Sequence, residues 1–286
     1  MEIHTSHSGQ DRDSLLTPRG TRALDLILQY RIQLVRCEPT THFNASAASR
    51  LFGTGDGLLH DGARQFHLER WENAEWLAYR ENFGRVILRY WDRTLELAPN
   101  RPWYRRRGTQ DAPEAARITC GLAVTLVDTA SQAHHRYFIV KPRETNLRPF
   151  ANAQRRVGLF THRDLAMRRQ IWLTPIDGAI HNVLFMQSPV LHEFGHTLGL
   201  GHVGGRGSGE RAYGATLAEQ QDIMGLGSRL SAGAAQPWIA QLRHHVIRAR
   251  AEPPLSFTAR VIAPQLVSYW DYDWVPDWRR RPAAGP

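Results

Sequence analysis

The sequence predicts an α+β fold, because segments with the alternation of β-strands stand beside a segment with the spacing of an α-helix. Apolar side chains occupy every second position of residues 24–34, as in a strand with one buried face, and this strand is expected to end near Cys37. Residues 118–126 alternate in the same way. In residues 76–91, apolar side chains instead recur every three or four positions, which predicts an amphipathic helix.

The remaining segments are weaker in pattern but complete the expected order of elements. Residues 38–62 are small, polar and rich in glycine, which predicts a long surface connection. Short apolar segments at residues 137–140 and 171–173 predict two further strands. After a glycine-rich loop at residues 201–214, apolar side chains at four-residue steps in residues 238–246 predict a last helix.

The length and composition of the chain favour one large domain with an extension at each end. A chain of 286 residues with 42% hydrophobic content can bury a substantial core, and we expect the domain at residues 21–252. The polar residues 1–20 are expected to form a flexible extension. Residues 253–286 form a second extension, rich in aromatic residues and proline. Its segment 269–278 is expected to pack back onto the domain, with docking onto a partner as the alternative.

The basic charge of the chain does not by itself indicate a nucleic-acid-binding protein. The formal net charge is +9, and Lys141 is the single lysine among 36 basic residues. The arginines are scattered, with short runs only at residues 105–107 and 279–281, so nucleic acid is not the expected partner. The scarcity of lysine would suit a protein delivered into a cell that uses ubiquitin, such as a secreted effector or toxin.

No targeting or membrane-spanning segment is expected. Residues 1–20 lack the apolar run of a secretory signal peptide, and nowhere does the sequence hold the run of about 18 apolar residues that a membrane-spanning helix needs. We therefore expect a soluble protein that is either cytoplasmic or exported by a signal-independent route. Cys37 and Cys120 stand in alternating apolar segments and are expected to be buried free thiols, with one disulfide as the alternative.

One short segment carries the chemistry of the chain. Ser188 and Pro189 are typical of the first residues of a helix, as the N-cap and the first helical position. His192 and His196 follow one helical turn apart, so both imidazoles can reach a single metal ion. Glu193 is rotated away from that face by about a quarter turn and is expected to lie beside the metal without binding it.

The third ligand comes from the chain beyond this helix. Gly199 stands where the helix must stop, and a glycine can adopt the left-handed conformation that reverses the chain. The turn brings His202 back toward the other two histidines. Three imidazoles leave the fourth position of a tetrahedral zinc ion open to water, as in a catalytic site, and Glu193 is placed to take a proton from that water.

Residues 192–202, His-Glu-Phe-Gly-His-Thr-Leu-Gly-Leu-Gly-His, resemble the signature of the metzincin clan of zinc endopeptidases. Residues 222–225, Asp-Ile-Met-Gly, resemble the Met-turn of that clan. The resemblance implies that the three histidines bind one zinc ion, that Glu193 is the general base, and that Met224 forms an apolar floor beneath the metal without binding it.

The resemblance also implies a fold. It predicts an N-terminal subdomain, ending near residue 200, in which helices back a twisted mixed β-sheet, followed by a smaller subdomain at residues 201–252 with the Met-turn and a helix. By analogy, residues 158–161 or 171–174 would bind substrate as an added strand. Val203 and Leu226 differ from the residues that several subfamilies carry at these places, so the subfamily is left open.

Two further residues are candidates for a role at the site. Tyr213, in the loop between the third histidine and the Met-turn, is a candidate for stabilising an oxyanion, against the alternative of an ordinary loop tyrosine. Residues 36–39, Arg-Cys-Glu-Pro, faintly resemble the inhibitory cysteine segment of latent matrix-type enzymes, which would place the Cys37 thiolate on the zinc.

The function predicted from the sequence is hydrolysis of peptide bonds in a protein or peptide substrate by a zinc-dependent endopeptidase. One alternative retains the zinc chemistry and changes the substrate, to peptidoglycan cross-bridges or small peptides. The other alternative is a non-catalytic, zinc-containing binding module. An intact Glu193 argues against this second alternative, because a binding module needs no general base.

Overall fold

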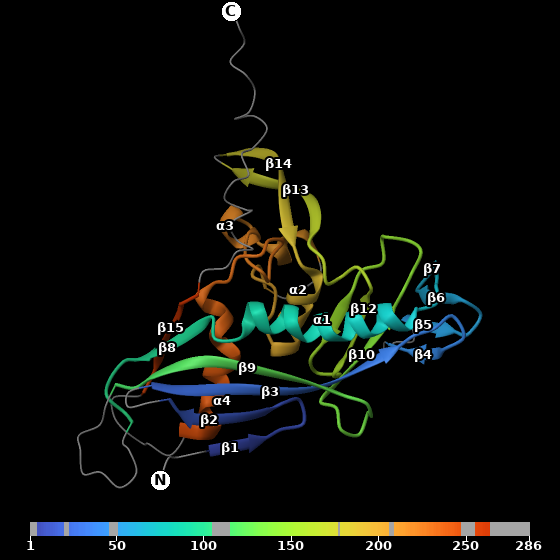
Figure 1. Ribbon diagram of the computed structural model, residues 1–286. Coiled ribbons are helices and arrows are strands. Elements are labelled where there is room, and N and C mark those ends of the chain that lie inside the picture. Colours follow the sequence, from blue (N-terminus) through green and yellow to red (C-terminus); the bar gives the residue numbers. More distant parts are fainter. Residues whose placement is uncertain are drawn as a thin grey trace, which may run out of the picture.

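A computed structural model of the chain describes residues 5–19, 23–45, 51–104, 115–176, 178–205, 209–246 and 255–263. The fold is α+β, with one large mixed sheet and few helices (Figure 1). The mixed sheet expected from the sequence is therefore present.

The centre of the large sheet is the 14-residue strand β3 (Ala23–Arg36). It runs parallel to β9 (Arg117–Val127) along one edge. Along its other edge, the first half of β3 pairs antiparallel with β2 (Asp13–Pro18) and the second half pairs parallel with β10 (His135–Val140). The strands predicted around residues 24–34, 118–126 and 137–140 are therefore confirmed.

The outer strands complete a nine-stranded sheet in the order β11-β12-β10-β3-β9-β8-β15, with β1 added beyond β2. Their bounds are Phe150–Asn152 for β11, Val157–Thr161 for β12, Leu95–Pro99 for β8, Phe257–Val261 for β15 and Thr5–Ser8 for β1. The short strand β11 is the last strand at one end of the sheet, and it lies next to the helix with the histidine motif.

Both terminal extensions expected from the sequence are partly built into this sheet. Residues 1–20 were expected to be flexible, yet they contribute β1 and β2. The reason is burial: Leu16 packs into the main core, and Ser14 is buried and accepts a hydrogen bond from the Gln241 side chain. At the other end, β15 pairs with β8. The aromatic segment 269–278 lies outside the described residues.

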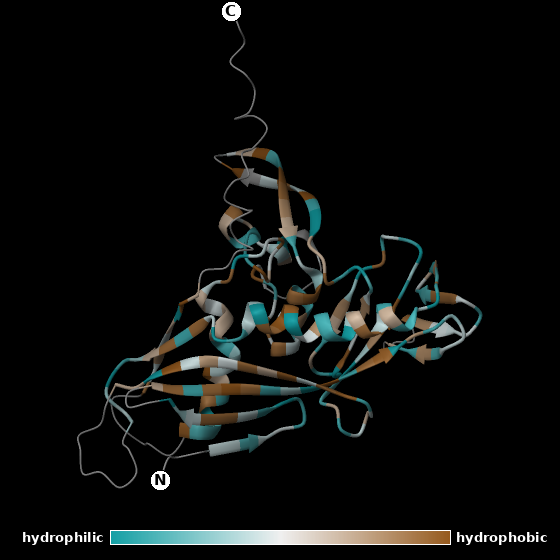
Figure 2. Ribbon diagram, viewed as in Figure 1, coloured by the Kyte–Doolittle hydropathy of each residue, from teal (hydrophilic) through white to brown (hydrophobic). Residues whose placement is uncertain are grey.

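Helix α1 (Asn73–Trp91) covers one face of the large sheet, as predicted (Figure 1). Its first turn is closed by a capping box, in which the backbone N–H of Glu72 donates to the Glu75 carboxylate at 3.1 Å. Its buried side chains are apolar and aromatic, and they pack against the mainly hydrophobic strands β3 and β9 (Figure 2). They are Trp76, Tyr79, Phe83, Ile87, Tyr90 and Trp91.

The surface connection expected at residues 38–62 is wrong, because three segments within this range are strands of a separate four-stranded antiparallel sheet. Its strands are β4 (His42–Asn44), β5 (Leu51–Thr54), β6 (Leu58–Asp61) and β7 (Arg64–His67). One buried residue from each strand joins a second core around Phe138. Gly53 is needed for close packing, since a Cβ there would lie 2.4 Å from the Phe43 ring. Gly55, Gly57 and Gly62 have positive φ, so the glycine-rich composition reflects close packing at Gly53 and turns between the strands.

The short strand predicted at residues 171–173 is part of a longer hairpin. Strands β13 (Arg168–Ile176) and β14 (Ala179–Gln187) pair antiparallel and project from the body of the protein (Figure 1). Ile171, Leu173 and Ile180 on this hairpin are more than 60% exposed. The apolar alternation correctly indicated a strand here. It could not predict that these apolar side chains would be exposed.

The chain after this hairpin forms short helices. Helix α2 (Pro189–Leu198) carries the histidine motif, and α3 (Leu217–Gln220) follows the 3₁₀ turn η1 (Glu210–Tyr213). The 3₁₀ turn η2 (Ala232–Ala235) leads into α4 (Gln236–Val246), which confirms the last predicted helix. Among the described helices, none is long and apolar enough to cross a membrane.

Two buried polar contacts tie the helices to the large sheet. On α4, the Trp238 indole N–H donates to the Gly121 carbonyl of β9 at 2.8 Å. On α2, the Thr197 hydroxyl lies 2.6 Å from the Tyr137 hydroxyl of β10. Thr197 also donates to the Glu193 carbonyl one turn earlier in the helix, at 3.3 Å. The Tyr137–Thr197 contact therefore connects the sheet to the helix that carries the histidines.

This contact predicts unequal effects of its two partners on stability. In Thr197→Val, the buried Tyr137 hydroxyl loses its partner, and we expect a loss of about 1–3 kcal/mol in the free energy of unfolding. In Tyr137→Phe, the Thr197 hydroxyl keeps its second partner, so the loss should be smaller. Urea unfolding of both single variants and the double variant measures the coupling. Strictly additive losses would contradict the contact.

Candidate metal centre

Helix α2 begins where the sequence predicts, but it is not capped as expected. Ser188 is at the N-cap position with extended backbone, and Pro189 occupies the first turn. The Ser188 hydroxyl makes no capping bond, and it has no hydrogen-bond partner among the described residues. Instead, the free N–H of Val190 donates to the carbonyl oxygen of Asp164 at 3.1 Å. A tertiary contact replaces the local cap.

The helix ends at Gly199, as predicted. Gly199 has φ of 101° and ψ of 11°, in the left-handed region that favours glycine. A Cβ at this position would meet no atom within 4 Å. Glycine is therefore favoured here by the backbone conformation, and not by a lack of space for a side chain. The Leu200 N–H donates to the Gly195 carbonyl at 3.0 Å, which closes the turn. The reversal sends the chain toward His202.

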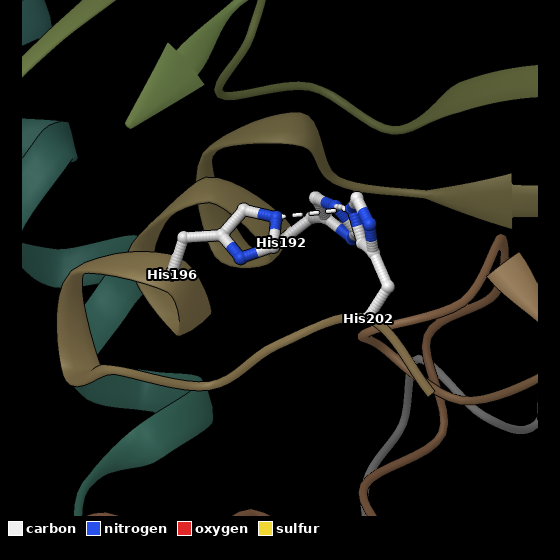
Figure 3. A group of neighbouring side chains, drawn as sticks. All are labelled: His192, His196 and His202. Carbon is white, nitrogen blue, oxygen red and sulfur yellow. Dashed lines mark hydrogen bonds between the residues drawn. The ribbon is translucent and has the colours of Figure 1, made fainter. Parts of the chain in front are cut away.

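The three predicted ligands meet at one point (Figure 3). The Nε2 atom of His202 lies 3.1 Å from that of His196 and 3.3 Å from that of His192. Bonds of about 2.0–2.1 Å from a tetrahedral zinc ion to nitrogen require ligand nitrogens about 3.3–3.4 Å apart. The observed spacing matches this requirement, so the group could hold a metal ion.

Backbone carbonyls set the tautomer of two of these rings. The Nδ1 atom of His192 lies 2.7 Å from the Ile223 carbonyl oxygen, and that of His196 lies 2.9 Å from the Leu200 carbonyl oxygen. A carbonyl oxygen can only accept a hydrogen bond, so the Nδ1 atom of each ring must carry the hydrogen. The Nε2 atom of each ring then carries a lone pair. These lone pairs face one another across the site. A cation between them satisfies all of them at once.

The electrostatic environment keeps two of the rings neutral. Burial, together with the neighbouring His196, lowers the pKa of His192 to about 3. Burial also lowers the pKa of His196, with His202 contributing. Neutral imidazole is the form that binds metals. His192 and His196 are therefore in the ligand state at neutral pH.

Glu193 lies beside this group, as the helical spacing predicts. It lines a cavity of about 190 Å³ together with His192. Its Oε2 atom accepts a hydrogen bond from the Ala151 N–H of β11 at 2.8 Å. Burial raises the pKa of Glu193 to about 8, and the charge of Asp164 acts in the same direction. Glu193 is thus a carboxyl group with raised basicity at the wall of the cavity.

Met224 lies beneath the histidines in a tight turn. The Gly225 N–H donates to the Asp222 carbonyl at 2.9 Å, and the Met224 N–H donates to the Asp222 carboxylate at 2.8 Å. The Met224 side chain is 3% exposed and packs in the main core. A Cβ on Gly195, inside the histidine motif, would lie 2.3 Å from the Met224 sulfur. Gly195 therefore lets the helix pack directly on the Met224 sulfur, and a Cβ there would force the buried Met224 side chain to move.

Tyr213 also lies at the site. Its ring centroid is 4.5 Å from that of His202, and the residue lines the same cavity as Glu193. Burial and the charge of Glu193 raise the pKa of the Tyr213 hydroxyl, so it remains a hydrogen-bond donor at neutral pH. Leu226, the second departure from the subfamily patterns, is buried and lines the cavity as well.

The cavity includes residues that no local sequence pattern identified. Gln187, at the end of β14, donates from its amide to the carbonyls of Ile223 and Gly225 at 3.2 and 2.9 Å, which ties the hairpin to the Met224 turn. Arg148 and Arg168 line the cavity as well. These residues come from three separate segments, so only the tertiary structure brings them together.

One of the two segments expected to accept a substrate strand is partly covered. Residues 158–161 lie in β12, which pairs with β10 on one side and, at residues 157–159, with β11 on the other. The outer strand is therefore β11, whose Ala151 contacts Glu193. Residues 171–174 lie in β13 and pair with β14 only, among the described strands.

Cys37 is not placed to bind the metal. It is fully buried in the second core, and its thiol donates to the Val35 carbonyl at 3.6 Å. Burial raises the pKa of the thiol to about 12, which opposes formation of the thiolate. The latency hypothesis is therefore wrong for this arrangement. Cys37 and Cys120 are both buried and free, as predicted.

Comparison with known proteins gives no match. No protein-family model, no curated protein and no solved structure is similar to this chain. The function must therefore be inferred from the residues of the site themselves.

The contact between Gly195 and Met224 predicts the effect of a single methyl group. In Gly195→Ala, the new Cβ overlaps the buried Met224 sulfur, and we expect a loss of about 1–3 kcal/mol in stability together with weaker metal binding. Thermal unfolding and metal content per chain measure the two effects.

Gly84→Ala is the matched control, because Gly84 is also inside a helix and a Cβ there meets no atom within 4 Å. This variant should be at least as stable as the parent chain, since alanine is the better helix former by about 1 kcal/mol. Equal behaviour of the two variants would show that Met224 does not constrain the helix.

Proposed function

We propose that this chain is a zinc-dependent endopeptidase of the metzincin type. The observation that carries the proposal is the convergence of three Nε2 atoms at the spacing of a tetrahedral ion, with a carboxyl group of raised basicity on the wall of the adjoining cavity. Three protein ligands suit a catalytic zinc site, because structural zinc sites use four. The signature at residues 192–202 and the Met224 turn support the same class of enzyme.

His192, His196 and His202 would hold the zinc ion through their Nε2 atoms. When bound, zinc supplies a Lewis acid that acidifies a water molecule and polarises the carbonyl of the scissile bond. The carbonyls of Ile223 and Leu200 hold two of the rings in the ligand tautomer.

Glu193 performs the proton transfers in this proposal. The Ala151 N–H holds its Oε2 atom, while Oε1 has no hydrogen-bond partner among the described residues and can accept the proton of a water molecule. The same carboxyl group then donates this proton to the nitrogen of the leaving amine. A group that both accepts and donates a proton needs a pKa near the working pH, and burial moves the pKa of Glu193 in that direction.

Tyr213 is proposed as a donor to the oxygen of the attacked carbonyl. It lines the cavity, and its ring packs beside His202. Its phenol is protonated at neutral pH because burial raises its pKa. A donor already in place stabilises negative charge as it develops on the carbonyl oxygen.

A polypeptide is the proposed substrate. The outer strand β11 lies beside Glu193, and an extended peptide can pair with a strand at the edge of a sheet. Hydrolysis of peptidoglycan cross-bridges or of small peptides would use the same residues. Cleavage of an unfolded protein distinguishes the first substrate class from the other two.

Glu193→Gln tests the general base. The change preserves the shape of the side chain and removes the proton acceptor, so kcat should fall by about 10²- to 10⁴-fold while one metal ion per chain is retained. Metal analysis and cleavage of an unfolded protein are measured on the same preparation. The control is Glu81→Gln on the exposed face of α1, which should leave both unchanged. Near-normal turnover of the Glu193 variant would refute the mechanism.

Tyr213→Phe tests the proposed oxyanion donor. Loss of one such donor should lower kcat by about 10²-fold, with little change in KM, because the contact forms mainly in the transition state. Metal content should stay the same, since the phenylalanine ring can still pack against His202. An unchanged kcat would reduce Tyr213 to a packing role.

A further inference from the structure

The cavity beside Glu193 is unusually rich in positive charge. Two guanidinium groups line it, from Arg148 and Arg168, and Glu193 is the only carboxyl group among the described residues that do so. If Glu193 serves as the general base, both arginines are in excess of what the hydrolysis requires. They therefore bear on which substrate the cavity accepts.

Arg168 is held in place by a buried acid. Its Nη2 atom contacts the carboxylate of Asp164, which is fully buried and also accepts the Thr161 N–H at 2.6 Å. The Asp164 carbonyl oxygen in turn accepts the N–H of Val190 in the first turn of α2. The Nε and Nη1 atoms of Arg168 donate to no described residue, and the side chain is 31% exposed. Arg168 is thus fixed, with donors left for a ligand.

Arg148 carries a charge that no acid neutralises. It is exposed, and among the described residues no carboxylate forms an ion pair with it. It stands two residues before β11, the strand whose Ala151 holds Glu193. Its charge reaches the site, because it lowers the pKa of Tyr213 against the effect of burial.

One face of strand β13 lines the cavity. Arg168, Gln170 and Trp172 alternate along β13 and line the cavity, whereas Arg169 between them is exposed and does not. The remaining cavity wall includes the apolar side chains of Trp172 and Leu226. A cavity of about 190 Å³ with apolar walls and two cations suits a short aliphatic stem that ends in a carboxylate.

We propose that Arg148 and Arg168 make this enzyme select substrates with a carboxylate close to the scissile bond. The inference rests on the proposed peptidase function and names its substrate class, an acidic polypeptide. Arg168 is the fixed donor, and Arg148 supplies the charge that is not neutralised within the protein. A guanidinium binds a carboxylate through charge-assisted hydrogen bonds that an amide of the same shape cannot replace.

The test compares two quenched fluorogenic peptides that differ only by glutamate or glutamine at one position, with the position varied on both sides of the cleaved bond. At one position, kcat/KM should favour glutamate by about tenfold or more. Each peptide is also made with a free and an amidated C-terminus. If kcat/KM depends only on whether the C-terminus is free, the recognised carboxylate is the C-terminus of the peptide. If amidation of the C-terminus has no effect on kcat/KM, the recognised carboxylate is the glutamate side chain.

Arg148→Gln is the decisive variant, because Arg148 has no described partner whose loss would disturb the fold. The glutamate preference should fall toward unity. The matched control is Arg169→Gln, which removes the same charge from the other face of β13 and should leave the activity and the preference unchanged. Equal loss of preference in both variants would mean that general basic charge steers acidic peptides, and would overturn the proposal.

A binding measurement separates this inference from the proposed function. Fluorescence anisotropy of the labelled peptides with Glu193→Gln should show the glutamate preference without turnover, and adding Arg148→Gln should remove it. If the parent chain cleaves both peptides with nearly equal kcat/KM, the inference is overturned and the proposed peptidase function is retained. Absence of cleavage overturns the peptidase, and the anisotropy then decides whether the cavity binds carboxylates.

Discussion

The structure around the site depends on three imidazole rings whose Nε2 atoms converge on one point. The carbonyls of Ile223 and Leu200 leave a lone pair on the Nε2 atoms of His192 and His196, so neither of these two atoms can donate a hydrogen bond to the other. The chain nevertheless holds them together through one helical turn, the left-handed Gly199, and the carbonyls of Ile223 and Leu200. Each of these features has a simple physical reason if the group binds a metal ion.

The rest of the fold keeps this arrangement rigid. Helix α2 packs through Gly195 directly on the Met224 sulfur, and its Thr197 contacts the Tyr137 hydroxyl on the sheet. On its other side, the carbonyl of Asp164 accepts the first free N–H of the helix. The same Asp164 fixes Arg168 at the cavity, so the support of the helix and the charge of the cavity share one residue.

The sequence predicted those parts of the site that depend on local spacing. The three histidines, Glu193 and Gly199 fall within one helix and its turn, so the helical repeat determined their relative positions. Ala151, Arg148 and Arg168 come from other segments, and no local pattern links them to the motif. In the fold, alternation identified the long strands, but β1, β2 and the sheet β4–β7 were missed because their strands are short, and their burial depends on partners distant in sequence. The cap expected at Ser188 failed for the same reason, since a tertiary contact took its place.

The most direct test of the account is the zinc content of the purified chain, measured together with cleavage of casein before and after treatment with a chelator. If the three histidines hold a catalytic zinc ion, we expect one zinc ion per chain, cleavage that stops when the metal is removed, and recovery when zinc is returned. A folded protein without metal, or cleavage that continues after the metal has been removed, would contradict it.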